Sequence, residues 1–413
     1  MKKIKATLTL DQIHSLKNQT FTDSEPGTLL KDFSTLLDFI GPTGIPVSGK
    51  NHLIAIKLLP QLNQLMTNPL DAKLKRPQQK SFPHINGLYL LLRASGLTQI
   101  AVEKKEAKLM LDNKVLADWQ SLNPTERYFA LFHTWWYRGS GEIIGESSRR
   151  WYYENYFYDS LDFFLNTLGK GLDVKAKLID PNLFRYEPGL HNLALMELFG
   201  FIRIEQGESL NGKNWPIAKI EPTVWGHALL NYFSKYMTLS DEIVDATSDN
   251  HQTELWGSEL KAYIPAWEKS LRQSEAVEIQ DSVCVFKVAL GSVYRKIAVP
   301  GITSLEELAG SILRAFNFDN DHLYEFIYKN RYGITERVVH PSLESDELYT
   351  TECVVGKLPL HKGMELIFHF DFGDDWRFQL VVESIASNDS RCSKPIVIEQ
   401  RGKPPEQYPD WDE

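Results

Sequence analysis

The sequence predicts an α+β protein, in which a helical N-terminal region is followed by a C-terminal α+β domain built from a β-hairpin, a helix and antiparallel strands. Two observations carry this prediction. Apolar residues in the first part of the chain recur at the three- and four-residue spacing of helices, whereas from Val283 onward they alternate with polar residues as strands do. Charge divides at the same place, because the net charge of −9 lies wholly after residue 275.

The charge asymmetry indicates separately built domains. Lys and Arg balance Asp and Glu at 31 each up to residue 275, but number 14 against 23 beyond it. The polar run from Ser240 to Glu254 has the composition of a surface connection. We therefore expect four segments, which are a winged-helix-like region over 1–136, a second over 137–240, a linker with a helix over 241–275 and an α+β domain over 276–413.

Composition excludes several classes of protein. With 413 residues, 43% hydrophobic and 24% charged, the chain is long and apolar enough for more than one folded core. Its three cysteines lack the spacing of a disulfide framework or a zinc cage, which favours a reducing compartment. No segment has the apolar length of a signal sequence or a membrane span, so we expect a cytoplasmic protein without membrane contact.

A helix, a strand hairpin and a second helix follow one another twice in the first part. The first copy runs from 87 through QIAVE and KLML to a helix that Asp112 caps, and the second from 190 through IRIE and IAKI to a helix that Thr223 caps. Gly96 and Gly200 occupy the helix-stop position. This is the local order of a winged-helix unit, and it predicts two such units.

An aromatic helix is predicted between the two copies. Asn123 caps it, Pro124 takes the first helical position and Glu126 completes a capping box. Its aromatic residues are spaced to line one face, and they are Phe129, Phe132, Trp135 and Trp136. We expect a core helix rather than a platform for stacking nucleic-acid bases.

The C-terminal part predicts strands, a helix and a closing hairpin. Strands over 283–290 and 294–300 are joined at Gly291-Ser292, Ser304 caps an amphipathic helix, and strands follow near 322–329 and 348–355.

In the last hairpin, over 365–385, apolar residues alternate on both strands. If both apolar rows face one core, Phe372 lies opposite Trp376 and Asp371 opposite Arg377.

Three uncommon motifs occur in order in this region. They are DHLYEF at 321–326, FDFGDDW at 370–376 and PPEQY at 404–408. With them, about residues 260 to 413 closely resemble the plasmid pRiA4b Orf-three-like family. The resemblance implies an α+β fold and a bacterial accessory protein often encoded in or near a mobile element, and it implies no catalytic residue.

Carboxylates gather at the last hairpin. Asp371, Asp374 and Asp375 are candidate ligands for a hard cation such as Mg²⁺, as in a metal-dependent nuclease. The alternative is that Asp and Gly supply a tight turn and that Asp371 pairs with Arg377.

One stretch, residues 50–108, is clearly basic, with ten cationic and three anionic side chains. Its candidate phosphate contacts are Lys73, Lys75, Arg76, Lys80, Lys104, Lys105 and Lys108. The alternative is an ordinary solvated face, since the chain as a whole is acidic.

Motifs for covalent or nucleotide chemistry are missing. The sequence has no GxSxG elbow, no Walker A loop and no GxGxxG after a strand. We expect no catalytic residue and no cofactor. The leading hypothesis is a non-catalytic bacterial accessory protein that docks an unidentified protein partner, with a DNA-binding protein and a metal-dependent hydrolase as the alternatives.

Overall fold

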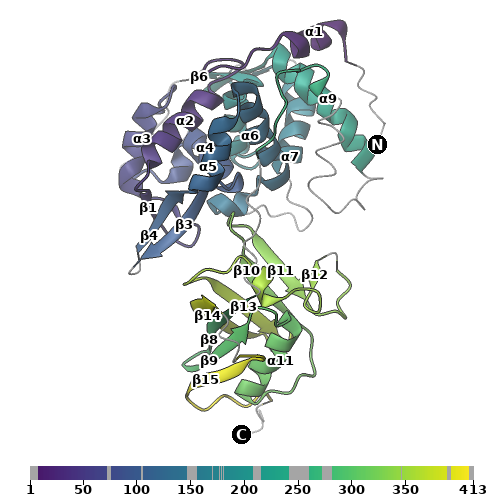
Figure 1. Cartoon of the computed structure of the whole chain (residues 1–413). Coiled ribbons are helices and arrows are strands. Elements are labelled where there is room, and N and C mark those ends of the chain that lie inside the picture. Colours follow the sequence, from purple (N-terminus) through teal and green to yellow (C-terminus); the bar gives the residue numbers. More distant parts are fainter. Residues whose placement is uncertain are drawn as a thin grey trace. The chain divides into compact units, whose positions relative to one another are not determined.

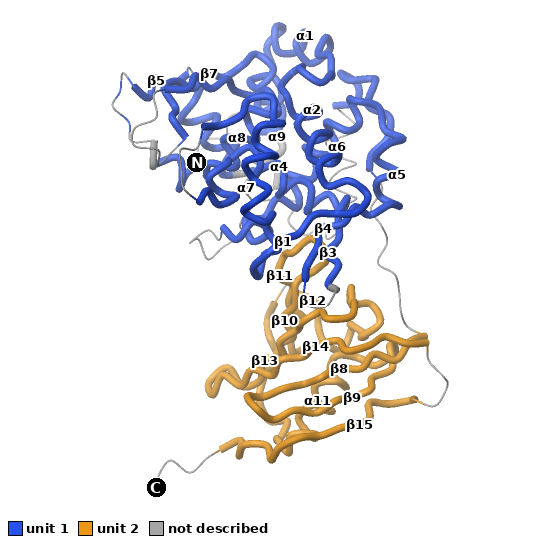
Figure 2. The backbone as a smooth tube through the Cα atoms, turned by 90° about the vertical axis from the view of Figure 1, so that its left-hand side faces the viewer, with its two compact units in different colours: residues 1–274 blue, residues 275–413 orange. Residues whose placement is uncertain are grey.

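The computed structural model has the α+β fold that the sequence predicts. It describes residues 8–71, 76–103, 106–146, 156–169, 171–175, 177, 179, 181–207, 215–240, 260–271, 281–345, 347–387 and 392–408. The chain divides into two compact units, residues 1–274 and 275–413 (Figure 2). The predicted linker lies outside the described residues over 241–259.

The described residues of unit 1 form helices and two small sheets (Figure 1). Its α-helices are α1 (Leu10–Asn18), α2 (Leu29–Ile40), α3 (Leu59–Leu65), α4 (Pro83–Ala94), α5 (Asn113–Ser121), α6 (Pro124–Arg138), α7 (Tyr156–Asp162), α8 (Leu190–Leu198) and α9 (Val224–Ser240). Its short helical turns are η1 (Ile56–Leu58), η2 (Gln79–Ser81), η3 (Gly141–Ile144), the π-helical η4 (Phe163–Leu168) and η5 (Pro181–Arg185). Its strands are β1 (Ile45–Ser48), β2 (Leu53–Ile54), β3 (Thr98–Glu103), β4 (Glu106–Leu111), β5 (Leu172–Asp173), β6 (Ile202–Gln206) and β7 (Ile217–Pro222).

The two sheets of unit 1 contain the two predicted hairpins. The first sheet has the order β2-β1-β4-β3 and the second the order β5-β7-β6. Each hairpin follows one helix and precedes another, as α4-β3-β4-α5 and as α8-β6-β7-α9. Gly96 and Gly200 follow α4 and α8 with φ angles of 77° and 75°, a left-handed conformation that favours glycine. Asp112 and Thr223 accept hydrogen bonds from the first turns of α5 and α9, as predicted.

Helix α6 is a core helix, as its aromatic pattern predicts. Asn123 and Glu126 form the expected capping box at its start. Phe129, Phe132 and Trp135 are buried. The ring of Trp135 stacks 5.3 Å from that of Phe199, just after α8. Aromatic packing therefore joins α6 to the second hairpin unit.

Helices α4 and α8 pack against each other at unusually close range. Every residue of α4 is buried. A Cβ atom on Gly87 would lie 2.8 Å from Cγ of Leu195 and 3.0 Å from the backbone oxygen of His191. The missing side chain at Gly87 is what allows this approach.

Polar groups inside this contact are paired. His84 Nε2 lies 2.7 Å from Glu197 Oε2, and His191 Nδ1 lies 3.0 Å from Glu146 Oε2. Burial raises the pKa of Glu146, but the hydrogen bond and charge of His191, together with nearby Lys80, lower that pKa overall. Because unpaired buried polar groups are costly, these pairs allow α4 and α8 to bury polar as well as apolar surface.

Adding a methyl group at Gly87 tests the α4–α8 contact. Gly87→Ala should destabilise the protein by about 1–3 kcal/mol, because backbone and a packed leucine occupy the space. Gly310→Ala is the matched control, since a Cβ atom there meets the mobile end of Arg314, and alanine in a helix is favoured over glycine by up to about 1 kcal/mol. Chemical denaturation of both variants measures the difference, and equal stabilities would mean that the helices do not pack closely.

The described residues of unit 2 form one sheet with one α-helix on a face. Its elements are β8 (Ser282–Leu290), β9 (Val293–Pro300), α11 (Leu305–Phe316), β10 (Tyr324–Lys329), β11 (Thr335–Val339), β12 (Leu348–Tyr349), η6 (Val355–Lys357), β13 (Glu365–Phe370), β14 (Trp376–Ser387) and β15 (Ile396–Arg401). The strand order is β12-β11-β10-β13-β14-β8-β9-β15, and neighbours are antiparallel except β11 and β12.

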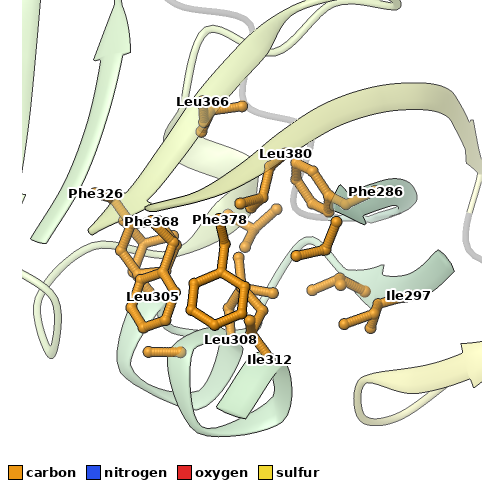
Figure 3. Packing of buried hydrophobic residues seen from close by; sticks show 14 of the residues in the cluster. Phe286, Ile297, Leu305, Leu308, Ile312, Phe326, Leu366, Phe368, Phe378 and Leu380 are labelled. Carbon is orange, nitrogen blue, oxygen red and sulfur yellow. The ribbon is translucent and has the colours of Figure 1, made fainter. Parts of the chain in front are cut away.

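Packing of α11 on the sheet makes the core of unit 2. Ser304 caps the helix by accepting a hydrogen bond from the Glu307 N–H. Leu308 and Ile312 of α11 belong to one buried cluster with Phe368 and Phe378 of the central strands (Figure 3). The apolar face that the sequence predicts for this helix therefore packs on the sheet, as expected.

The register of the last hairpin differs from the predicted one by two residues. Phe370 lies opposite Trp376, and five residues connect the strands. Asp371 and Asp375 adopt left-handed φ angles of 53° and 55° in this connection. The parity is as predicted, but Asp371 ends the pairing, because its side chain accepts hydrogen bonds from the backbone that follows. Phe372 is consequently exposed, and Arg377 lies opposite His369 rather than Asp371.

Two other elements differ from expectation. The strand predicted over 348–355 is the two-residue β12, which η6 follows at Val355. Strand β15 is not among the predicted strands, because its sequence IVIEQR does not alternate apolar with polar residues. In the structure every one of its residues is exposed.

Truncation of a core aromatic tests the observed register. Phe378→Ala should lower the free energy of unfolding by about 3–5 kcal/mol, because it leaves a cavity under α11. Phe372→Ala, on the exposed turn, should cost less than about 1 kcal/mol. Chemical denaturation distinguishes them, and similar losses would mean that the hairpin is paired differently.

Candidate functional site

The three uncommon sequence motifs meet at one corner of unit 2. DHLYEF leads into β10, FDFGDDW forms the connection from β13 to β14, and PPEQY follows β15. We call this the motif corner, and it consists of residues 319–325, 369–377 and 407–408. Three segments that are distant in sequence thus form one polar surface.

Contacts between the segments hold the motif corner together. The Asp319 N–H donates to Gln407 Oε1 at 2.6 Å, and Gln407 Nε2 donates to Asp321 at 3.2 Å. His322 Nε2 lies 3.5 Å from Asp371 Oδ2. The buried side chain of Gln407 therefore fixes the tail to the loop before β10.

Asp371 organises the turn itself. Its Oδ1 accepts hydrogen bonds from the N–H groups of Gly373 and Asp374 at 3.0 and 3.3 Å. The carboxylate thereby replaces the strand pairing that stops at Phe370. Its role as a turn residue agrees with the alternative that the sequence left open, whereas pairing with Arg377 does not occur.

His369 bridges two carboxylates across the sheet face. Its Nδ1 lies 3.1 Å from Glu325 Oε1 on β10, and its Nε2 lies 2.8 Å from Asp375 Oδ1 in the turn. Arg337 pairs with Glu325, and Arg377 donates to Asp375 at 2.8 Å. The hydrogen bond from Arg377 is the largest influence on Asp375 and lowers its pKa.

Tyr408 closes the other side of the motif corner. Its hydroxyl donates to Asp321 Oδ2 at 2.7 Å. This hydrogen bond raises the pKa of Tyr408 to about 12 and lowers the pKa of Asp321. Tyr408 and Phe372 remain 50% and 43% exposed, so the corner presents two aromatic rings beside its carboxylates.

The three candidate metal ligands are brought to one turn, but two of them have protein partners. Asp371 binds backbone N–H groups and Asp375 contacts His369 and Arg377, while Asp374 is exposed. Within the described part of the chain, no group of three or more His, Cys, Asp or Glu side chains is arranged to hold a metal ion. Binding of a metal by these carboxylates stays a prediction.

The candidate nucleic-acid contacts are described in part. Lys73, Lys75, Lys104 and Lys105 lie outside the described residues. Arg76, Lys80 and Lys108 are exposed. Lys80 lies close enough to Glu146 to influence its pKa, which reduces the positive charge that it offers. DNA binding by this segment also stays a prediction.

Sequence reasoning did not single out Glu325, His369 or Tyr408 as members of one site. Their contacts join residues 44 and 87 positions apart, which no local pattern reveals. The available signal was the motifs themselves, because DHLYEF, FDFGDDW and PPEQY contain most residues of the corner.

Each described helix of the protein is too short or too polar to cross a membrane.

Comparison with known proteins identifies the C-terminal unit. Residues 283–410 match the family described as Plasmid pRiA4b ORF-3-like protein, which confirms the resemblance that the motifs carry. The match is confined to the C-terminal region of the chain. A solved structure with similarity is a protein of unknown function, MM3350 from Methanosarcina mazei Go1, at 18% identity and a TM-score of 0.28, over 30% of this chain and 71% of that one. No curated protein matches the sequence significantly.

Titration of Tyr408 tests the motif corner. Asp321→Asn removes the carboxylate that holds the phenol proton, so the pKa of Tyr408 should fall from about 12 towards its ordinary value of 10. Because the folded pKa lies above the ordinary one, this contact stabilises the fold below pH 10 and its contribution is lost as pH rises through the folded pKa. NMR of ¹³C-labelled tyrosine measures the shift, and an unchanged pKa in the variant would contradict the contact.

Proposed function

We propose that the protein is a non-catalytic bacterial accessory protein that docks a protein partner through the motif corner of its C-terminal unit. One observation carries the proposal. Hydrogen bonds of polar side chains connect and order the segments that contain the three sequence motifs, and Phe372 and Tyr408 are exposed on the resulting surface. Aromatic rings on a preorganised polar surface are typical anchors of protein interfaces.

The expected partner surface is basic. Asp321 and Asp374 are exposed in the motif corner, and residues 276–413 contain 23 acidic against 14 basic side chains. Complementary charge favours encounter with a cationic segment, in which a basic side chain contacts these carboxylates while Phe372 packs on its apolar part.

Packing in unit 1 supports a scaffold rather than a DNA reader. In a winged-helix-like order, the helix before the hairpin is the one that would enter a DNA groove. In this chain those helices are α4 and α8, and each buries the other. A helix without an exposed face has no side chains to offer to base edges.

The contacts of the carboxylates argue against the hydrolase alternative. A two-metal nuclease needs carboxylate oxygens that are free to bind cations and a reacting phosphate. Asp371 and Asp375 already bind backbone, histidine and arginine groups. The plasmid in the family's description supports an accessory role linked to a mobile element.

A paired variant tests the proposal. Phe372→Ser with Asp374→Lys removes the anchor and reverses a charge on the motif corner, so a partner recovered from extracts of the native host with wild-type protein should be lost. Ile302→Ser with Glu352→Lys makes the same two types of change at exposed positions elsewhere in unit 2 and should keep the partner.

Two results would contradict the proposal. Retardation of duplex DNA at about 50 mM salt by the full chain, lost on reversing Arg76 and Lys80, would favour the DNA-binding alternative. Turnover of DNA, RNA or nucleotides with Mg²⁺ or Mn²⁺ that Asp374→Ala abolishes would favour the hydrolase.

A further inference from the structure

Strand β15 is an exposed apolar edge of the sheet in unit 2. It is the last strand in the sheet order, and its neighbour among the described residues is β9 (Figure 1). Ile396, Val397 and Ile398 are 45%, 41% and 56% exposed. An edge strand with three consecutive branched apolar residues favours pairing with a strand of another chain.

The backbone of β15 adds hydrogen-bonding groups to this apolar surface. Because β15 pairs on one side with β9, its outward N–H and C=O groups have no described strand to bind. A bulge between Val397 and Glu399 leaves Ile398 without a partner residue on β9. The side chain of Ile398 is accordingly the most exposed of the three.

Cations flank the apolar residues. Lys394, Arg401 and Lys403 are exposed, and no described side chain forms an ion pair with any of them. The one acidic residue of the strand, Glu399, is already engaged, because it accepts from the Tyr294 hydroxyl at 2.5 Å and pairs with Lys296 at 2.9 Å. The edge therefore offers positive charge on a domain that is acidic as a whole.

A second copy of the chain matches this edge poorly. Two β15 strands paired about a twofold axis run antiparallel. Full overlap of six residues then places Val397 opposite Gln400 and Ile398 opposite Glu399 of the other copy. Apolar side chains of one copy would lie opposite polar side chains of the other, so two β15 strands are poorly matched as partners.

We propose that β15 binds an extended segment of a partner protein as an additional strand, and that this segment combines branched apolar residues with carboxylates at its ends. Its backbone completes the edge, its apolar side chains cover Ile396–Ile398, and its carboxylates contact Lys394, Arg401 and Lys403. This surface is separate from the motif corner and of opposite charge, so the inference does not rest on the proposed function.

A synthetic peptide tests this inference on the full-length protein. The probe is a labelled peptide with alternating valine and threonine between two glutamates at each end. Fluorescence anisotropy should show half-saturation below about 1 mM, the affinity expected of a short strand addition, and binding should weaken as salt rises. A peptide with lysines in place of the glutamates, and one N-methylated at alternate residues, should each bind at least about tenfold more weakly, because they lack the charge or the backbone donors.

Variants locate the peptide on β15. Ile398→Ser and the pair Arg401→Glu with Lys403→Glu should each weaken binding by about tenfold or more. Ile302→Ser and Lys362→Glu change the same types of side chain at other exposed positions of unit 2 and should bind as the wild type does. Circular dichroism and thermal melting establish that each variant is folded.

Three outcomes would overturn the inference. One is no binding of the acidic peptide at about 1 mM. Another is equal binding of the lysine or N-methylated peptide, which would mean that contact does not use the edge. The third is concentration-dependent dimerisation of the full chain that Ile398→Ser abolishes, measured by analytical ultracentrifugation, which would make a second copy the occupant.

Discussion

Helices α4 and α8 approach so closely at Gly87 that the backbone of one helix lies in the space a side chain of the other would need. Several elements of unit 1 pack on one of these two helices: α2, α6 and β3 contact α4, while α7 and β6 contact α8. Gly96 and Gly200 end the two helices and turn the chain into the hairpins, so the position of each sheet depends on where its helix lies. The aromatic face of α6 then packs on the residues that follow α8.

This contact also has a consequence for function. The two hairpin units have the order of elements of a winged-helix domain. In such a domain the helix before the hairpin contacts DNA, whereas here those helices, α4 and α8, pack against each other. Pairing of polar groups such as His84–Glu197 gives the contact a defined register, because displacing either helix would leave these polar groups without partners. The buried positions of α4 and α8 are the reason why we propose a scaffold role for unit 1.

In unit 2 the polar residues divide into two surfaces with different chemistry. At the motif corner, the carboxylates of Asp321, Asp371 and Asp375 contact tyrosine, backbone, histidine and arginine groups. Asp374 is exposed, so the corner is an acidic surface with exposed aromatic rings. Among the described residues no strand pairs with the outer edge of β15, and the charges that flank this strand are positive. One small sheet can thus offer a side-chain surface and a main-chain surface, which recognise different features of a protein chain.

The sequence by itself determined the α+β class, the order of helices and hairpins, the glycine stops, the cap residues and the family of the C-terminal unit, because each depends on local patterns. It located most residues of the motif corner but not their contacts, since Glu325 meets His369 and Asp321 meets Tyr408 through strand pairing and tail position. The hairpin register was two residues wrong because the Asp371 carboxylate ends the pairing, which alternation of apolar residues does not encode. Burial of α4 and exposure of β15 were decided by the tertiary structure alone, because whether an apolar segment is covered depends on which element packs beside it.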